Sequence, residues 1–391
     1  MKRICFVVDS IFSIGGVQRV TAVIAKELAR TYDVSILTFD KPETMDTTLY
    51  GLHEASISYR FFCYPQVNSL KLKCYRIYSG IYRKLQLSSK WASDLYAYSS
   101  FPPERQNALA HTLAEGKYDV IVGVHAPLAA RLASLRKQLP QTKLFGWIHN
   151  SFEALFGETS LYIGPDRKRH YVFQFRKLDE TILLCKHDVE SYHTYDPDFH
   201  PVYIYNPLTL QPGSPSDGNS KRFLAIGRFS HLHKGFDLLI EAFHLFAQKD
   251  KEWMLDIVGE GVEEDMYKSL IQKYQLEERV TIHPFTNKIQ AYYSKAQVYV
   301  LSSRWEGFGL VLVEAMAHGL PIVSSDLPTS KEILGDFGIY YNNGSLEGLC
   351  KALQEATKLD WQTKSKEALD IAQRFDIDNI AKQWRQMIEN D

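Results

Sequence analysis

The stretch SRWEGFGLVLVEAMAHGLPIVSSD, residues 303–326, carries two glutamates that lie eight positions apart, Glu306 and Glu314. A short apolar run at 298–301 precedes it and predicts a buried strand. A Gly-Phe-Gly turn then leads into an apolar helix, and a second short strand follows at 320–325. Strand, loop, helix and strand in this order predict part of a parallel α/β sheet, with Glu306 in the loop at the carboxyl end of a strand.

The start of this predicted helix suits a phosphate group. Phe308, Gly309 and Leu310 present backbone N–H groups at the positive end of the helix dipole. Carboxylates such as Glu306 and Glu314 accept hydrogen bonds from sugar hydroxyls, so we expect a ligand with sugar, phosphate and nucleoside parts. The alternative is two solvated acids, but the helix is apolar nearly all round, and a buried glutamate requires a partner.

The alternation of strands and helices continues through both halves of the chain and predicts an α/β fold of two doubly wound, Rossmann-like domains. Apolar runs predict strands in the first half at 3–9, 33–39, 118–125, 143–149, 181–185 and 202–205, and in the second half at 223–227, 253–258, 280–283, 298–301 and 321–325. The stretch 209–221 is rich in Pro, Gly and Ser and is the predicted linker. We therefore expect domains at 1–208 and 222–375, with a ligand cleft at the carboxyl ends of their strands.

The composition is that of an ordinary globular protein, with 45% hydrophobic and 23% charged residues among 391. A net charge of -1 gives no overall attraction to nucleic acid or to an anionic membrane. The five cysteines are scattered without a metal-binding spacing, which is typical of free thiols in a reducing compartment. The apolar run after Lys2 and Arg3 is too short for a signal peptide, and no run approaches the roughly 20 residues of a membrane span. We expect a cytoplasmic protein.

The second domain opens with FLAIGRFSHLHKGFDLLIEAF, residues 223–243, which places Gly-Arg and Lys-Gly in the loop after a strand. The guanidinium group of Arg228 suits bidentate hydrogen bonds to phosphate oxygens, and the ammonium group of Lys234 acts as a point charge. Both therefore suit a diphosphate leaving group, which gains negative charge as it departs. Taken alone, each of these two residues fits an ordinary solvent-exposed loop cation equally well. Combined with the downstream glutamates, they favour a binding site.

These linked motifs resemble the E-x7-E signature of retaining, family-four glycosyltransferases with the GT-B fold. The resemblance covers essentially the whole chain and implies transfer of a hexose or N-acetylhexosamine from a nucleotide diphosphate sugar, with a UDP-sugar as the expected donor. It implies that Arg228 and Lys234 stabilise the diphosphate, that Glu306 holds the sugar and that Glu314 holds the ribose. It also implies that the C-terminal helix 376–391 packs back on the first domain.

The resemblance extends to four further positions. Gly15 and Gly16 match the family's glycine loop, although Gln18 stands where Glu is common; a plain structural turn is the alternative. His149, which follows a strand, matches a histidine near the reacting sugar. Gly259 matches the Gly-x-Gly turn beside the nucleotide, although such turns are common.

No Asp-x-Asp motif occupies a suitable loop, so we expect no metal and no cofactor. The acceptor is expected to be a glycan or a lipid-linked molecule of cell-surface polysaccharide synthesis. Two alternatives stay open: an epimerase of the same fold, which needs no acceptor, and a non-catalytic sugar-nucleotide-binding subunit.

The segment 70–90 is basic and rich in aromatic and aliphatic residues, and it predicts an amphipathic helix. Such a helix suits peripheral contact with an anionic membrane at its inner face. An ordinary surface helix with solvated cations is the alternative.

Overall fold

The computed structural model describes residues 1–87, 89–158, 160–211, 213–230 and 232–390. The predicted linker, the basic segment 70–90 and the predicted C-terminal helix each contain one position (212, 88 and 391) outside these residues. The chain divides into two compact units, one of Met1–Pro207 together with the stretch from Ile377, and one of Leu208–Asp376.

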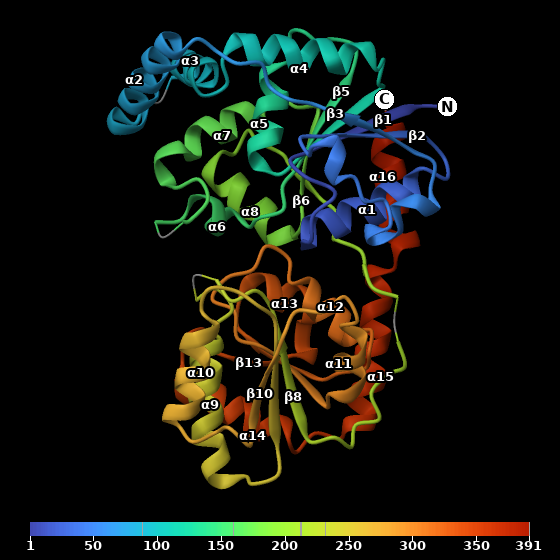
Figure 1. The fold of residues 1–391 in the computed structure, drawn as a ribbon, viewed down its shortest axis with the longest axis vertical. Coiled ribbons are helices and arrows are strands. Elements are labelled where there is room, and N and C mark those ends of the chain that lie inside the picture. Colours follow the sequence, from blue (N-terminus) through green and yellow to red (C-terminus); the bar gives the residue numbers. More distant parts are fainter. Residues whose placement is uncertain (88, 159, 212, 231, 391) are drawn as a thin grey trace. The chain divides into compact units, whose positions relative to one another are not determined.

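The first unit is built on a seven-stranded parallel sheet with the order β3-β2-β1-β4-β5-β6-β7 (Figure 1). Its elements are β1 (Arg3–Val8), α1 (Gly16–Leu28), β2 (Asp33–Thr38), β3 (Ile57–Phe61), α2 (Ser69–Leu85), α3 (Lys90–Ser100), α4 (Pro103–Glu115), β4 (Val120–Val124), α5 (Ala126–Ser134), β5 (Lys143–Trp147), α6 (Phe152–Phe156), α7 (Lys168–Phe175), β6 (Glu180–Leu183), α8 (Lys186–Tyr195), β7 (Val202–Tyr203) and α16 (Ile377–Glu389), with 3-10 turns at Pro42–Thr44, Leu49–Glu54 and Pro165–Arg167. The central strand β1 is apolar and buried from Ile4 to Val8, because helices cover both faces of the sheet.

The second unit has a six-stranded parallel sheet with the order β10-β9-β8-β11-β12-β13. Its elements are β8 (Arg222–Ile226), α9 (Phe236–Lys249), β9 (Met254–Val258), α10 (Glu264–Lys273), β10 (Val280–His283), α11 (Gln290–Lys295), β11 (Val298–Leu301), α12 (Leu310–Met316), β12 (Ile322–Ser325), α13 (Pro328–Leu334), β13 (Ile339–Tyr341), α14 (Leu346–Ala356) and α15 (Trp361–Ala372), with 3-10 turns at Gly335–Phe337 and Gln373–Phe375. Helix α9 packs against α10 and α14, and α12 packs against α15.

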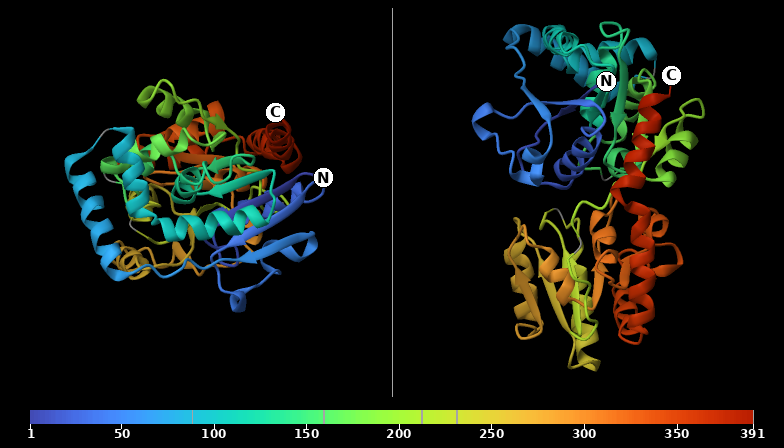
Figure 2. Two further views of the ribbon diagram at one scale, coloured as in Figure 1. Left: turned by 90° about the horizontal axis from the view of Figure 1, so that it is seen from above. Right: turned by 90° about the vertical axis from the view of Figure 1, so that its right-hand side faces the viewer.

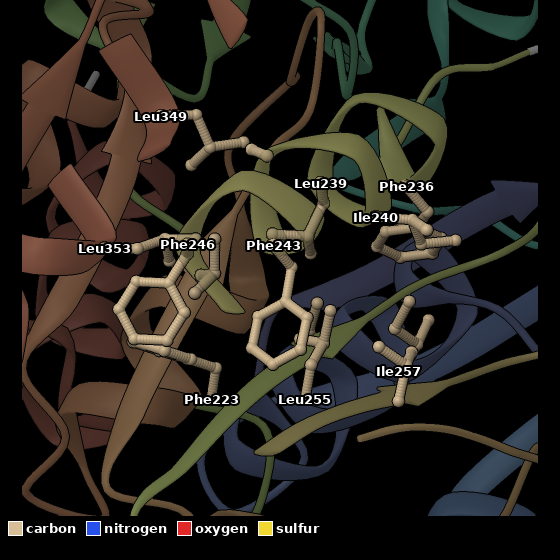
Figure 3. Packing of buried hydrophobic residues seen from close by; sticks show 14 of the residues in the cluster. Phe223, Phe236, Leu239, Ile240, Phe243, Phe246, Leu255, Ile257, Leu349 and Leu353 are labelled. Atoms are coloured by element: carbon tan, nitrogen blue, oxygen red, sulfur yellow. The ribbon is translucent and has the colours of Figure 1, made fainter. Parts of the chain in front are cut away.

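The core of the second unit lies between α9 and the strands. Figure 3 shows one apolar side of α9 lying over β8 and β9, with α14 alongside. The helix contributes Phe236, Leu239, Ile240, Phe243 and Phe246, which face Phe223, Leu255, Ile257, Leu349 and Leu353. This packing fixes the strands whose carboxyl ends carry the loops of the candidate site.

The C-terminal segment continues from α15 into α16. The helix α15 belongs to the second unit and α16 to the first, and a 3-10 turn with Asp376 separates them. Trp384 of α16 is fully buried against Phe6 and Trp147 of the first sheet, at ring distances of 6.1 and 4.8 Å. Figure 2 shows α16 running beside this sheet.

Part of the predicted linker packs against the second unit, although most of its described residues are exposed. Ser216 is buried, and its N–H donates to the carbonyl oxygen of His318 at 3.1 Å. Gly218 lies against the ring of Trp361, so this stretch is part of the second unit. Two strands were missed by the sequence analysis, the half-buried edge strand β3 and the three-residue strand β13.

Candidate functional site

The loop after β8 brings Lys234 back over the end of its own strand. A Cβ atom on Gly227 would lie 2.7 Å from Cγ of Lys234, so the lysine stem covers this glycine. The next residue, Gly235, has a positive φ of 63°, and a Cβ there would come within 2.1 Å of the carbonyl oxygen of Ser302. Ser302 in turn donates its hydroxyl to the carbonyl oxygen of Lys234 at 2.7 Å. The Lys-Gly pair is therefore held against the loop after β11.

Lys234 and Glu306 form an ion pair in the second unit. The Nζ of Lys234 lies 2.6 Å from Oε1 of Glu306, and their side chains are 14% and 8% exposed. Ser303 donates its hydroxyl to the same Oε1 at 2.6 Å. Among the described residues, the bonds found at this carboxylate end on Oε1, which leaves Oε2 for another donor.

The electrostatics keep this carboxylate ionised. Burial alone would raise the pKa of Glu306, but the charge of Lys234, the neighbouring His233 and the hydrogen bonds from Lys234 and Ser303 outweigh it. The pKa of Glu306 therefore lies below its usual value. At neutral pH the site holds a paired, negatively charged oxygen beside an ammonium group.

Further contacts fasten the loops after β8 and β11 to each other. The rings of His233 and Trp305 stack at 4.6 Å with an angle of 9°, and Nε2 of His233 lies 2.6 Å from the carbonyl oxygen of Trp305. Arg304 forms two hydrogen bonds, at 2.9 and 2.6 Å, with the carboxylate of Asp237 on α9. Both side chains of the ion pair are thus placed by their neighbours. No spacing in the sequence links these supporting residues, so they were not predicted.

Glu314 lies in a separate buried contact within the same unit. It is 2% exposed, so the prediction of a buried apolar helix is confirmed. Its Oε2 accepts a hydrogen bond from the hydroxyl of Tyr293 at 2.9 Å, and its Oε1 accepts one from Thr209 at 3.4 Å. No sequence signal singled out Tyr293. The role of Glu314 toward a ribose stays a prediction.

Among the described residues, no contact is found between the ion pair and the other predicted donor-site residues of this unit. Arg228 is exposed, and its guanidinium forms no ion pair within the described part of the chain. Phe308 is buried edge to face against Phe375 at 5.9 Å, and Gly309 precedes α12 with a φ of 82°. Leu310 is the first residue of α12. Their binding roles stay predictions.

Gly259 has a structural reason to be glycine. A Cβ at this position would lie 1.9 Å from the carbonyl oxygen of Gly227, because the loops after β8 and β9 touch there. Close backbone approach alone explains the residue. A contact between Gly259 and the donor remains a prediction.

In the first unit, the loop between β1 and α1 is held by two side chains. The N–H of Gly15 donates to the hydroxyl of Tyr50 at 2.8 Å, and Asp40 accepts from the N–H of Ile11 at 2.8 Å. Gly15 is extended, with a φ of 179°, and Gly16 begins α1. A positive φ is thus not the reason for either glycine, and close approach of a ligand stays a prediction.

His149 follows β5 and is buried in the first unit. Its ring lies 4.3 Å from that of Trp147 and 5.4 Å from that of His125, and its Nε2 has no hydrogen-bond partner among the described residues. Burial, and then the neighbouring His125, lower the pKa of His149 well below its usual value, so the imidazole is neutral. His125 has a strained backbone with a φ of 77°. Strain and a buried polar atom without a partner are features of functional sites.

Comparison with known proteins bears on both units. The sequence of residues 209–374 matches the family described as glycosyl transferases group 1. The chain is 26% identical to an uncharacterized glycosyltransferase of Haemophilus influenzae, over 98% of this chain and 99% of that protein. It is 34% identical, over 41% of this chain and 45% of that protein, to an N-acetylgalactosamine-N,N'-diacetylbacillosaminyl-diphospho-undecaprenol 4-alpha-N-acetylgalactosaminyltransferase of Campylobacter jejuni.

The fold is also that of a solved structure. The structure of Anabaena HepE in complex with UDP and glucose superposes with a TM-score of 0.75 and 21% identity, covering 99% of each chain. This likeness shows the fold and includes both Rossmann-like units. Residues 209–374 thus resemble the glycosyl transferases group 1 family, and the chain has the GT-B fold.

Proposed function

We propose that the protein is a retaining, metal-independent glycosyltransferase that moves a hexose or N-acetylhexosamine from a nucleotide diphosphate sugar, with UDP as the nucleotide. The single observation that carries this proposal is the pair of Lys234 and Glu306. An ammonium group and an ionised carboxylate lie 2.6 Å apart at the carboxyl edge of the second sheet, where ligands of such folds bind.

The hydrogen-bonding atoms that this pair leaves unused match the two parts of the donor. Lys234 has three N–H donors, and one of them reaches Glu306, so others can reach a diphosphate. Oε2 of Glu306 can accept from a sugar hydroxyl. In the proposed reaction, the bond between the anomeric carbon and the diphosphate oxygen breaks as the acceptor hydroxyl attacks from the same face. The acceptor proton passes to an oxygen of the departing diphosphate.

Lys234 would act mainly on the transition state. The diphosphate gains negative charge as it leaves, and a cation fixed in a poorly hydrated loop stabilises that charge more than it stabilises the bound donor. In this proposal Arg228 adds a second cation, Glu314 holds the ribose, and the neutral His149 orients the sugar. The glycine loop of Gly15 and Gly16 and the segment from Phe308 to Leu310 approach the phosphates.

The acceptor is proposed to be a glycan or a lipid-linked molecule used in cell-surface polysaccharide synthesis. The name of the Campylobacter jejuni relative, which includes diphospho-undecaprenol, supports a lipid-linked acceptor. We place the enzyme in the cytoplasm, at the inner face of the membrane. Among the described residues, no helix is long and apolar enough to cross a bilayer.

Helix α2 supports the peripheral location. It presents an apolar stripe at helical spacing that is unusually exposed: Leu70 at 70%, Ile77 at 64%, Ile81 at 45% and Leu85 at 63%. Beside the stripe, the helix carries exposed basic side chains and no acidic residue; the exposed cations are Lys71, Lys73, Arg76, Arg83 and Lys84. Trp91, which is 72% exposed, follows at the start of α3. An apolar stripe with flanking cations is the pattern of a helix that lies on an anionic bilayer.

Release of nucleotide diphosphate, measured with and without acceptor, tests the proposed reaction. A transferase releases the nucleotide diphosphate in proportion to the acceptor consumed and forms a glycoside of unchanged anomeric configuration. An epimerase converts the donor without acceptor, and a non-catalytic binder releases no product. Either of these two results, or an inverted product, would overturn the proposal.

A further inference from the structure

A cavity of about 120 Å³ lies in the first unit, bounded by α3, α5 and the start of α7. Sites for drug-sized ligands measure roughly 300–1,000 Å³, so this cavity is too small for a nucleotide sugar. It takes a small group. The cavity is therefore not the donor site proposed above.

Two arginines line this cavity, and neither forms a hydrogen bond with an acidic residue in the described part of the chain. Arg131 lies over the rings of Tyr64 and Phe101, at 5.7 and 5.6 Å, and it donates a long hydrogen bond to the hydroxyl of Tyr64 at 3.5 Å. Arg167 donates to the carbonyl oxygen of Ile163. Its Nε lies 3.7 Å from Asp166, which is too far for a hydrogen bond, and this atom is buried without a hydrogen-bond partner in the described chain.

The remaining polar wall also consists of groups that can donate. Ser100, Ser134, Tyr96 and Tyr171 add hydroxyl groups, and none of the lining residues found in the described chain is acidic. Burial raises the pKa of both tyrosines, so their phenols keep their protons at neutral pH. His170 completes the wall; burial lowers its pKa to about 3, so it adds no charge. Two guanidinium groups among neutral donors fit a small oxyanion.

We propose that this cavity binds a phosphate monoester group, held by Arg131 and Arg167. The group is either free in solution or carried by a lipid. A lipid source has a structural route, because α3, which forms one wall, packs against the exposed basic helix α2. The inference goes beyond the proposed donor site, since the phosphate held here is neither the donor nor its product.

The test measures binding and needs no sugar donor, so it is independent of the transferase proposal. Isothermal titration calorimetry of the full chain would use three probes: inorganic phosphate, sn-glycerol 3-phosphate and geranyl phosphate. We expect saturable binding of at least one of them. Tighter binding of geranyl phosphate than of the other two assigns an isoprenoid lipid source, and equal binding assigns the phosphate group alone.

Three variants locate the binding. Arg167→Gln removes one charge, and we expect it to weaken binding by about tenfold or more. Ala130→Leu keeps every charge and fills the cavity, so it tests the location even if the arginine variant is less stable. Arg169→Gln, two residues further along the chain in α7, is the matched control, because this exposed arginine does not line the cavity.

The expected result is loss of binding in Arg167→Gln and Ala130→Leu, and unchanged binding in Arg169→Gln. Thermal melts confirm that each variant is folded. No binding of any probe to the native chain would overturn the proposal. Unchanged binding in Ala130→Leu, or an equal loss in Arg169→Gln, would overturn it as well.

Discussion

Nζ of Lys234 lies 2.6 Å from Oε1 of Glu306, although 71 residues separate the two in the chain. The contact exists because β8 and β11 are neighbours in the sheet and their following loops are bonded to each other through His233, Trp305 and Arg304. Lys234 and Glu306, which the sequence indicated through two separate motifs, thus form a single ion pair.

Replacing either member of this pair should abolish transfer. We expect Lys234→Met and Glu306→Gln to lower kcat/KM by about 10²-fold or more, because each removes a charge that the proposed mechanism uses to bind the donor. Lys234→Met also leaves a buried carboxylate without its cation, which costs about 3–5 kcal/mol of stability. Steady-state kinetics and urea unfolding measure the two effects.

The double variant Lys234→Met with Glu306→Leu separates stability from activity. It removes both charges, so much of the lost stability should return while transfer stays absent. Near-normal turnover in a folded single variant would remove these residues from the catalytic site.

Gly235 is expected to control the position of Lys234. Gly235→Ala places a Cβ 2.1 Å from the carbonyl oxygen of Ser302, in a residue whose φ is 63°. Gly344→Ala is the matched control, because its φ is 82° and nothing lies within 4 Å of the new Cβ. Both variants bear the strain of a positive φ, about 1–2 kcal/mol, but only Gly235→Ala should also lower kcat. Equal kinetics in the two variants would show that the clash does not reach the site.

The hydroxyl of Tyr293 is expected to stabilise the second unit through Glu314. Tyr293→Phe removes the donor to Oε2 of this buried carboxylate, which should cost about 1–3 kcal/mol in urea unfolding. Tyr292→Phe is the control, since this neighbour packs its ring on His283 and no hydrogen bond of its hydroxyl is found in the described chain. A loss in Tyr292→Phe as large as that in Tyr293→Phe would contradict the assigned role.

His149 should make folding stability depend on pH. Its folded pKa lies well below 6.5, so below pH 6.5 the unfolded chain binds a proton that the folded chain refuses. Stability is therefore lost as the pH falls below 6.5. In His149→Asn the slope of unfolding free energy between pH 6.5 and 5 should be smaller by up to about 1.4 kcal/mol per pH unit. If urea titrations give the same pH dependence of the unfolding free energy for both proteins, the pKa of His149 is not lowered by folding.

Helix α2 should bind anionic bilayers. Replacing the pairs Ile77/Ile81 with Ser and Lys73/Lys84 with Gln should each weaken co-sedimentation with liposomes containing phosphatidylglycerol by about tenfold or more. Val262→Ser with Met266→Ser removes exposed apolar side chains in the second unit and should change nothing. Equal binding of the native chain to neutral and anionic liposomes would refute the membrane contact.

Much of the fold could be predicted because the central strands are buried on both faces and therefore appear as continuous apolar runs. The edge strand β3 could not, since it is only half-buried and contains Arg60, which pairs with Glu115. The short strand β13 has only three residues, too few to show a period.

The candidate site was predictable as residue types and spacing, but not as contacts. The sequence selected Lys234, Glu306 and Glu314, because charged residues after strands and a glutamate in an apolar helix are informative by themselves. It did not show that Tyr293 binds Glu314, because that contact depends on how α11 and α12 pack. It also did not predict that Arg228 forms no ion pair with any residue that the structure describes.

A crystal structure with a bound nucleotide diphosphate sugar tests the central claim most directly. The account predicts diphosphate oxygens within hydrogen-bond distance of Nζ of Lys234 and a sugar hydroxyl on Oε2 of Glu306. A diphosphate bound away from Lys234, with the ion pair unchanged beside it, would contradict the account.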